Sequence, residues 1–182
     1  MTTKLRATIE DLYRVPDNAK AEIVEGEIVL MSPTGDMPAR AGFKIAMSLS
    51  QMEGEIRGRA YPDNVGYRVD LPYRDSFSPD ASFYVGKSTG MRFLEGAPVF
   101  AVEVRSENDY GAIAEGAIAR KRGDYFAAGT LVVWDVDLLS PDAIRSHDVD
   151  NPDTPRIFRR GDIADAEPAV PGWRIPVDEL FP

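Results

Sequence analysis

The sequence predicts an α/β protein in which helices cover a central mixed sheet, and three observations support this fold class. Residues 41–56 place apolar side chains at three- and four-residue steps, the period of a helix that buries one face. The segments PVFAVEV (98–104) and TLVVWDVD (130–137) are short apolar runs typical of buried strands. A helical stretch from about 112 to 128 lies between these two runs. Together they form a right-handed strand-helix-strand crossover.

The composition indicates one soluble domain spanning residues 1–182. A chain of 182 residues is long enough for one substantial core and short for two. With 43% hydrophobic and 28% charged residues it has the composition of an ordinary globular protein. No run of 18 apolar residues could span a bilayer, and the N-terminus MTTKLRATIEDLYRV lacks the apolar stretch of a signal peptide. We therefore expect a cytoplasmic protein.

Charge and the scarcity of soft metal ligands narrow the function. Thirty acidic against 21 basic residues give a net charge of −9, so the protein as a whole repels polyanions and any nucleic-acid site must be local. The absence of cysteine from the sequence excludes disulfides, thiolate metal sites and a cysteine nucleophile. The one histidine, His147, stands beside a turn signal and is expected in a solvated loop rather than in a catalytic site.

The N-terminal third predicts a short helix, a hairpin and a long helix. TIEDLYRV is typical of a helix capped by Thr8, with Asp11 in its first turn. AEIVEGEIVLMSP predicts two strands around an acid-glycine turn at 25–26. The apolar period then predicts a helix of five or six turns from Asp36 to about 57, ended by Gly58 and covering a sheet.

The rest of the chain predicts strands around one further helix. VGYRVDLPY alternates like a strand, and PDASFYVG begins another after a proline. The strand VFAVEV, the helix that ends at Gly129 and the strand TLVVWDVD form the crossover, which indicates a largely parallel sheet. The tail segments AIRSHDV, RIFRRGD and WRIPVDELFP predict edge strands and a last short helix.

Glu103 is an acid within an otherwise apolar strand. Side chains alternate along a strand, so Glu103 shares a face with Ala101 and Arg105. It lies near the carboxyl end of the strand, where open α/β sheets place their ligand crevice. A buried acid costs several kcal/mol unless it is paired or bound to metal. Glu103 is therefore either a metal ligand or the partner of Arg105 or Lys121 in an ion pair.

Asp80 and Glu103 together predict a divalent metal site. Asp80 follows Pro79 at the beginning of a strand, and the chain between it and Glu103 is long enough to return in the adjacent strand. Two carboxylates and the main-chain carbonyl of Val104 would form an oxygen-rich pocket that prefers Mg²⁺ or Mn²⁺. Lys121, in the following helix, could lean over this pocket. The alternatives are a turn cap for Asp80 and a solvated helix face for Lys121.

Five blocks, in this order, carry a resemblance to a known family: AEIVEGEIVLMSPTG, SPDASFYV, FAVEVRSEND, ARKRGDYFAAGTLVVWDVD and PGWRIPVDELF. They are similar to the Uma2 family, the DUF820 group of restriction-endonuclease-like proteins within the PD-(D/E)XK nuclease superfamily. The match covers nearly the entire chain. The resemblance implies a restriction-endonuclease-like α/β/α core with a central mixed sheet, a divalent-metal site and nuclease activity.

The resemblance also implies roles for single residues. Asp80 is similar to the acid of the PD motif, Glu103 to the acid of the (D/E)XK strand, and Lys121 to a lysine moved onto the following helix. Glu22 resembles an acid of the hairpin block that reaches the same pocket. Arg105 stands where the motif has lysine, so either Lys121 supplies the amine or Arg105 replaces it, although arginine cannot serve as a base. DMPAR stands where many members have a histidine after MSPTG.

We therefore expect an Mg²⁺-dependent or Mn²⁺-dependent endonuclease acting on DNA, with a homodimer plausible for two-strand cleavage. The alternatives are an inactive nuclease fold used for binding or assembly, and a hydrolase of smaller phosphorylated substrates. GKST at 86–89 is not a phosphate loop, because the required upstream glycine is missing. Four arginines form either a local basic strip for nucleic acid or a solubilising surface: Arg57, Arg59, Arg68 and Arg74.

Overall fold

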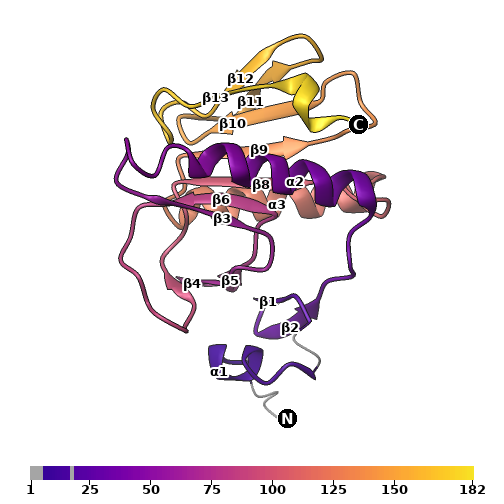
Figure 1. Cartoon of the computed structure of the whole chain (residues 1–182). Coiled ribbons are helices and arrows are strands. Elements are labelled where there is room, and N and C mark those ends of the chain that lie inside the picture. The colour runs from indigo at the N-terminus through magenta and orange to yellow at the C-terminus, as the bar shows by residue number, and fades with distance from the viewer. Residues whose placement is uncertain (1–5, 17–18) are drawn as a thin grey trace.

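A six-stranded sheet with a helix on each face forms the centre of the computed structural model, which describes residues 6–16 and 19–182. Figure 1 shows α2 (Asp36–Ser50) crossing one face of this sheet and α3 (Ala112–Ala127) behind the other. This layering confirms the predicted α/β class. The strands follow the order β11-β10-β9-β8-β6-β3. Their bounds are β3 Arg59–Pro62, β6 Ala81–Tyr84, β8 Phe100–Val104, β9 Val132–Val136, β10 Ile144–Asp148 and β11 Asn151–Phe158.

The six-stranded sheet is mixed, but the prediction that it is largely parallel was wrong. Strands β8 and β9 run parallel, in register from Phe100 opposite Val132 to Val104 opposite Val136. The other four pairs of neighbouring strands are antiparallel. Of the connections between neighbouring strands, the one through α3 is a helical crossover, as a parallel return requires. The short turns after β9 and β10 make antiparallel hairpins instead.

A second sheet of five strands lies on the α3 side and was not predicted as a unit. The hairpin of β1 and β2 is the one predicted around residues 25–26. Glu25 and Gly26 both adopt positive φ, as a type I′ turn requires. Strand β5 was missed because its inward side chains are polar: Arg74 and Ser76 are buried, and the Ser76 hydroxyl accepts the Ile23 N–H at 2.8 Å. The bounds are β1 Ala21–Val24, β2 Glu27–Leu30, β4 Tyr67–Leu71, β5 Arg74–Phe77 and β7 Leu94–Glu95.

Helix α2 is shorter than its apolar pattern predicts. It ends at Ser50, about two turns before the expected end near Arg57. From Gln51 to Glu53 the backbone N–H groups bond three residues back instead of four, and Gly54 follows, a residue that weakens a helix by about 1 kcal/mol relative to alanine. Met52 still packs on the core. The apolar period therefore persists through a segment of turns.

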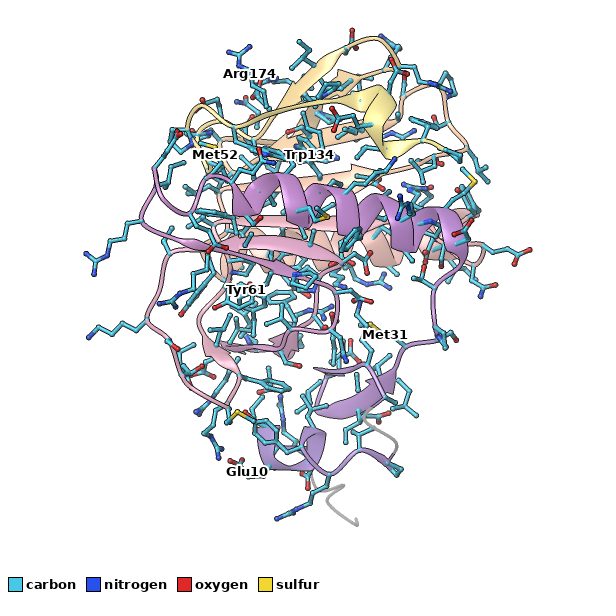
Figure 2. The ribbon with its side chains drawn as sticks, viewed as in Figure 1. Glu10, Met31, Met52, Tyr61, Trp134 and Arg174 are labelled. Carbon is cyan, nitrogen blue, oxygen red and sulfur yellow. The ribbon has the colours of Figure 1, made fainter. Side chains whose placement is uncertain are left out.

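Two apolar clusters lie on the two faces of the six-stranded sheet. On the α2 side the Trp134 ring lies 5.1 Å from Phe100 and 5.3 Å from Trp173 between ring centroids (Figure 2). On the α3 side Tyr125 stacks on Phe77 of the second sheet at 4.0 Å. This second contact fastens the five-stranded sheet to α3, and so it fixes the residues that the two sheets contribute to a shared pocket.

The N-terminal helix and the last short helix lie where the sequence predicts them. Helix α1 (Ile9–Leu12) begins after Thr8, as predicted, and the Thr8 backbone N–H donates to the Asp11 carboxylate at 2.9 Å, which is the reciprocal bond of a capping box. The tail adds a two-stranded sheet and a 3₁₀ helix. None of the helices in the described part of the chain is both long and apolar enough to cross a bilayer. The tail elements are β12 Ile163–Asp165, β13 Arg174–Pro176 and η2 Val177–Leu180.

Two predictions about the tail were wrong. Strand β10 is not an edge strand, because β9 and β11 flank it. His147 lies within β10 and is only 4% exposed, not in a solvated loop. Its Nδ1 atom is 2.7 Å from the carbonyl oxygen of Pro152, and burial lowers the pKa of the imidazole. In β10 the neighbours Ser146 and His147 are both buried, so the strand lacks the simple two-residue alternation that would have marked it in the sequence.

Candidate active site

Asp80 and Glu103 meet at the start of β6 and the end of β8. The backbone N–H of Asp80 donates to the carbonyl of Val102 at 3.0 Å, which continues the antiparallel pairing of the two strands past Ala81. The Asp80 carboxylate accepts the backbone N–H of Val104 at 2.8 Å through Oδ2. The two acids are therefore cross-strand neighbours at the same end of β6 and β8, and the sequence predicted that they lie on adjacent strands.

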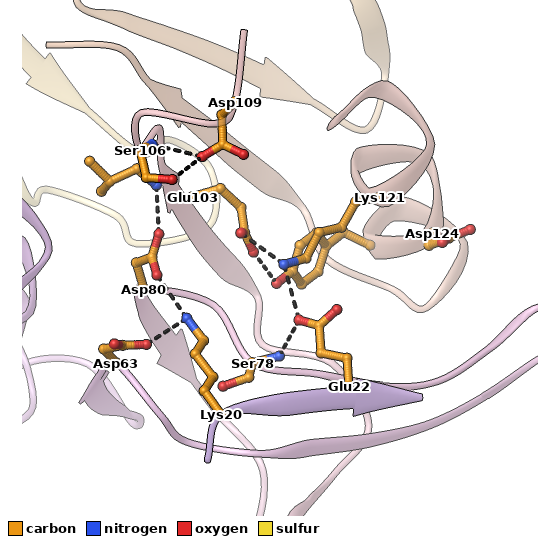
Figure 3. Close-up of polar contacts among 12 residues, drawn as sticks. Lys20, Glu22, Asp63, Ser78, Asp80, Glu103, Ser106, Asp109, Lys121 and Asp124 are labelled. Atoms are coloured by element: carbon orange, nitrogen blue, oxygen red, sulfur yellow. Dashed lines mark hydrogen bonds and ion pairs between the residues drawn. The ribbon is translucent and has the colours of Figure 1, made fainter. Parts of the chain in front are cut away.

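Lys121 bridges two acids that come from different sheets. Its Nζ atom lies 2.8 Å from Oε2 of Glu103 on β8 and 3.0 Å from Oε1 of Glu22 on β1 (Figure 3). Tyr125, one turn later on α3, donates its hydroxyl to Oε1 of Glu103 at 2.7 Å. The helix therefore supplies both donors to Glu103, because residues four apart lie on one helix face.

Glu22 is the most deeply buried acid of the pocket, with 3% of its side chain exposed. It accepts the backbone N–H of Ser78 at 2.8 Å through Oε1 and the Arg74 guanidinium at 2.6 Å through Oε2. Arg74 in turn donates to Asp124 on α3 at 2.7 Å. Both oxygens of Glu22 are thus committed to fixed donors, which makes Glu22 an anchor for Lys121.

Lys20 belongs to the pocket and was missed in the sequence. Its Nζ atom lies 2.8 Å from Oδ1 of Asp80 and 2.6 Å from Oδ1 of Asp63 (Figure 3). Lys20 and Glu22 stand two residues apart where β1 begins, so they lie on one face of an extended chain. That spacing was the signal for Lys20, just as the four-residue step from Lys121 was the signal for Tyr125.

The charges of the pocket control one another. Burial raises the pKa of the Glu103 carboxyl, with Asp80 and Glu22 adding to the effect and Lys121 opposing it. Burial by itself would lower the pKa of Lys121, but the carboxylates of Glu103 and Glu22 outweigh it and raise the pKa above its usual value. Lys121 is therefore protonated at neutral pH. It can stabilise negative charge but cannot act as a base.

Arg105 lies outside the pocket. Its guanidinium donates to both oxygens of Asp135 on β9, at 2.7 Å and 2.6 Å, and also contacts Glu115 of α3. The structure thus brings Asp80, Glu103, Lys121 and Glu22 together and directs Arg105 to a separate ion-pair cluster. Lys121, not Arg105, holds the position beside the strand acid.

Asp80 and Glu103 give the pocket two carboxylates, the type of ligand that small divalent cations prefer. In residues 6–16 and 19–182, no three acid or histidine side chains converge into a ready-made metal cage. Mg²⁺ does not require such a cage, because it keeps several waters and binds through one or two carboxylates plus substrate phosphates. Asp80 and Glu103 supply two carboxylates at one sheet edge, 20% and 25% exposed, next to the main chain of Val104.

We expect Tyr125→Phe to lower the free energy of unfolding by about 1.5 kcal/mol, because the variant keeps the stack on Phe77 and loses the hydrogen bond to the Glu103 carboxylate. Urea denaturation would measure the change. Tyr73→Phe, at a side chain that is 70% exposed, is the control and should stay within about 0.5 kcal/mol of the wild type. Equal stability of the two variants would show that the bond to Glu103 contributes nothing.

Comparison with known proteins identifies the family and agrees with the fold. The family model Uma2, described as "Putative restriction endonuclease", matches residues 8–178. The fold is similar to a crystal structure of a "putative nuclease belonging to DUF820" from Anabaena variabilis ATCC 29413, with a TM-score of 0.73 and 14% sequence identity over 96% of this chain and 97% of that one. No curated protein matches. Because the family model covers nearly the whole sequence, the chain belongs to the Uma2 family.

Proposed function

We propose that the protein is an Mg²⁺-dependent endonuclease that hydrolyses phosphodiester bonds in DNA. The observation that carries the proposal is the contact of Lys121 with Glu103 at 2.8 Å, beside the neighbouring carboxylate of Asp80. Two acids and a protonated amine are the side chains that metal-assisted phosphodiester hydrolysis needs. The family description "Putative restriction endonuclease" and the fold shared with a "putative nuclease belonging to DUF820" support the same reaction class.

Asp80, Glu103 and the main-chain carbonyl of Val104 would hold Mg²⁺ or Mn²⁺. When bound, such an ion lowers the pKa of a water and offsets the charge of the phosphate. Lys20 contacts both Asp80 and Asp63. If Asp80 binds a metal ion instead, Lys20 still has Asp63 as its ion-pair partner. The remaining parts of the reaction fall to side chains on α3 and β1.

Lys121 would stabilise the negative charge that develops on the phosphate. Its amine is held by Glu103 and Glu22, and Glu22 is fixed in turn by Arg74 and the Ser78 N–H, so the amine needs little reorganisation when a substrate binds. Protonation at neutral pH suits this role. We include a cytoplasmic homodimer in the proposal, because a two-fold assembly would present two such pockets to the two strands of a duplex.

The proposal predicts that the purified protein binds Mn²⁺ in a calorimetric titration and nicks supercoiled plasmid in Mg²⁺ or Mn²⁺, but not in EDTA. Gel electrophoresis over time would give the rate of nicking. Ca²⁺ serves as a matched ion of the same charge that commonly supports binding without turnover. Metal binding without nicking of DNA or of RNA under any of these conditions would contradict the endonuclease proposal.

A second candidate is a nuclease fold that binds without catalysis. It is favoured by the closure of the pocket, because all four carboxylate oxygens of Asp80 and Glu103 already accept hydrogen bonds from Lys20, Val104, Lys121 and Tyr125. In that case Glu103 is a structural ion-pair partner. The same titration separates the two candidates, since a protein of this second kind would bind no Mn²⁺ and leave the plasmid intact.

A further inference from the structure

A solvent-open groove of about 640 Å³ lies at the far end of β6 from Asp80. One wall is the turn that leads into the edge strand β3, and the other is the loop after β6. Arg57, Arg59 and Lys87 are all exposed and project along these walls. The groove is lined by Glu53, Arg57, Gly58, Arg59, Val85, Gly86, Lys87 and Ser88. Three cations thus face one acid.

The three cationic side chains of the groove have no bonded partner within residues 6–16 and 19–182. The side chains of Arg57, Arg59 and Lys87 form no hydrogen bond or ion pair there, in a protein whose net charge is −9. The one acid of the lining, Glu53, accepts the backbone N–H of Ala60 at 2.9 Å and is held there. Of the four arginines considered from the sequence as a basic strip, only Arg57 and Arg59 line the groove. Arg68 lies 3.6 Å from Glu95, and Arg74 is buried in the candidate active site.

The backbone of β3 does not offer a strand edge to another polypeptide. Residues 60 and 62 of β3 turn their backbone nitrogens away from β6, because the Ala60 N–H donates to Glu53 and residues two apart in a strand point the same way. Ala60 gives its N–H to Glu53, and Pro62 has none. A partner strand would therefore lack donors to pair with, which is how natural sheets protect their edges. The groove can be recognised through its cationic side chains, and these call for an anion.

At two glycines that line the groove, the backbone packs too closely on buried rings to accept a side chain. A Cβ atom at Gly58 would lie 2.3 Å from the Phe83 ring, and one at Gly86 would lie 2.0 Å from the Tyr84 hydroxyl. Both rings are buried, so neither can move aside cheaply. The sequence thus keeps backbone at the bottom of the groove and long cationic side chains at its rim, a shape suited to a chain of phosphates.

We propose that this groove binds the phosphate backbone of the nucleic acid that reaches the candidate active site, an inference that rests on the proposed function. Arg59 pairs with Tyr84, four residues along β6 from Asp80, which is about 13 Å of strand. That length corresponds to about four base pairs of duplex. The groove would hold phosphates a short way from the bond being cut, and it would position the strand without reading its sequence.

The test is a triple variant, Arg57→Gln, Arg59→Gln and Lys87→Gln, with a matched triple variant, Arg14→Gln, Arg160→Gln and Arg174→Gln, as control. Both change the net charge from −9 to −12, and the control residues are exposed and lie on other elements (Arg174 is labelled in Figure 2). Fluorescence anisotropy of a labelled 20-base-pair DNA would give Kd between 50 and 200 mM salt, in EDTA so that no strand is cut.

The groove variant should bind the DNA about 10- to 100-fold more weakly than the wild type at 100 mM salt, with the slope of log K against log salt flatter by about 2 to 3. The control variant should keep the wild-type slope. Equal losses in the two variants would show a general charge effect and overturn the proposal. So would a wild-type Kd in the groove variant, or binding of a partner protein at the groove in place of nucleic acid.

This outcome is separable from that of the proposed catalysis. If DNA binding depends on the groove but no plasmid is nicked in Mg²⁺ or Mn²⁺, the groove assignment stands and the nuclease proposal fails. If the wild type nicks plasmid and the groove variant binds DNA as tightly as the wild type does, the nuclease proposal stands and the groove assignment fails. The three side chains substituted in each triple variant are exposed, so thermal unfolding should show that both variants are folded.

Discussion

Replacing Glu103 by glutamine should reduce plasmid nicking by about 10²- to 10³-fold or more and abolish Mn²⁺ binding in calorimetry. The variant loses one of the two carboxylates proposed to hold the metal, and it keeps the shape of the side chain. Lys121 retains Glu22 at 3.0 Å, and the Tyr125 hydroxyl retains an oxygen to donate to.

The stability of the Glu103→Gln variant should not fall along with its activity. Burial raises the pKa of Glu103, so the folded protein disfavours the charged form. A neutral glutamine should leave the thermal midpoint unchanged or slightly higher, as often happens at functional sites. Glu95→Gln, at an exposed acid paired with Arg68, has the same charge change and should keep full activity. Full nicking by Glu103→Gln would exclude Glu103 from the reaction.

Arg105→Leu should lower the free energy of unfolding by about 3–5 kcal/mol, because it leaves Asp135 charged, buried and without its bidentate partner. Only 6% of each side chain is exposed in this pair. Nicking activity per folded molecule should stay within about threefold of the wild type, since Arg105 points away from the pocket. Urea denaturation and a nicking assay at low temperature would measure the two effects separately.

Two controls make the Arg105 prediction specific. Arg160→Leu breaks an exposed pair with Asp178 and should cost less than about 1 kcal/mol. The double variant Arg105→Leu/Asp135→Leu should recover much of the lost stability, because a buried ion pair can be replaced by apolar side chains of similar volume. Loss of activity in Arg105→Leu with stability unchanged would instead place Arg105 in the reaction.

The strands and helices that bury an apolar face could be predicted from the sequence. The crossover from β8 through α3 to β9, the hairpin at 25–26 and the face assignment of Glu103 all follow from side-chain period and turn residues, and the structure agrees. Strand β5 could not be predicted in this way. The method depends on apolar side chains that alternate along a strand, whereas β5 buries the polar side chains of Arg74 and Ser76. Their partners come from β1, some fifty residues earlier.

The candidate site could be predicted in part for the same reason. Asp80, Glu103 and Lys121 stand at positions that a strand end and a following helix define, so local pattern and family resemblance were enough to find them. Lys20 and Tyr125 become visible only when contacts distant in sequence are known, since Lys20 reaches Asp80 across 60 residues. Arg105 shows the converse, because its position matched a motif while its ion pairs with Asp135 and Glu115 hold it elsewhere.

The bridge from Lys121 to Glu22 determines when the pocket can exist during folding. It joins a helix to a hairpin strand 99 residues earlier (121 minus 22), and such long loops close late. A ribosome-bound chain that has released only its first hundred residues contains Lys20, Glu22 and Asp80 but neither Glu103 nor Lys121. Such a chain lacks the assembled pocket until α3 has emerged and docked. Any nuclease activity would therefore be withheld from incomplete chains by the order of synthesis itself.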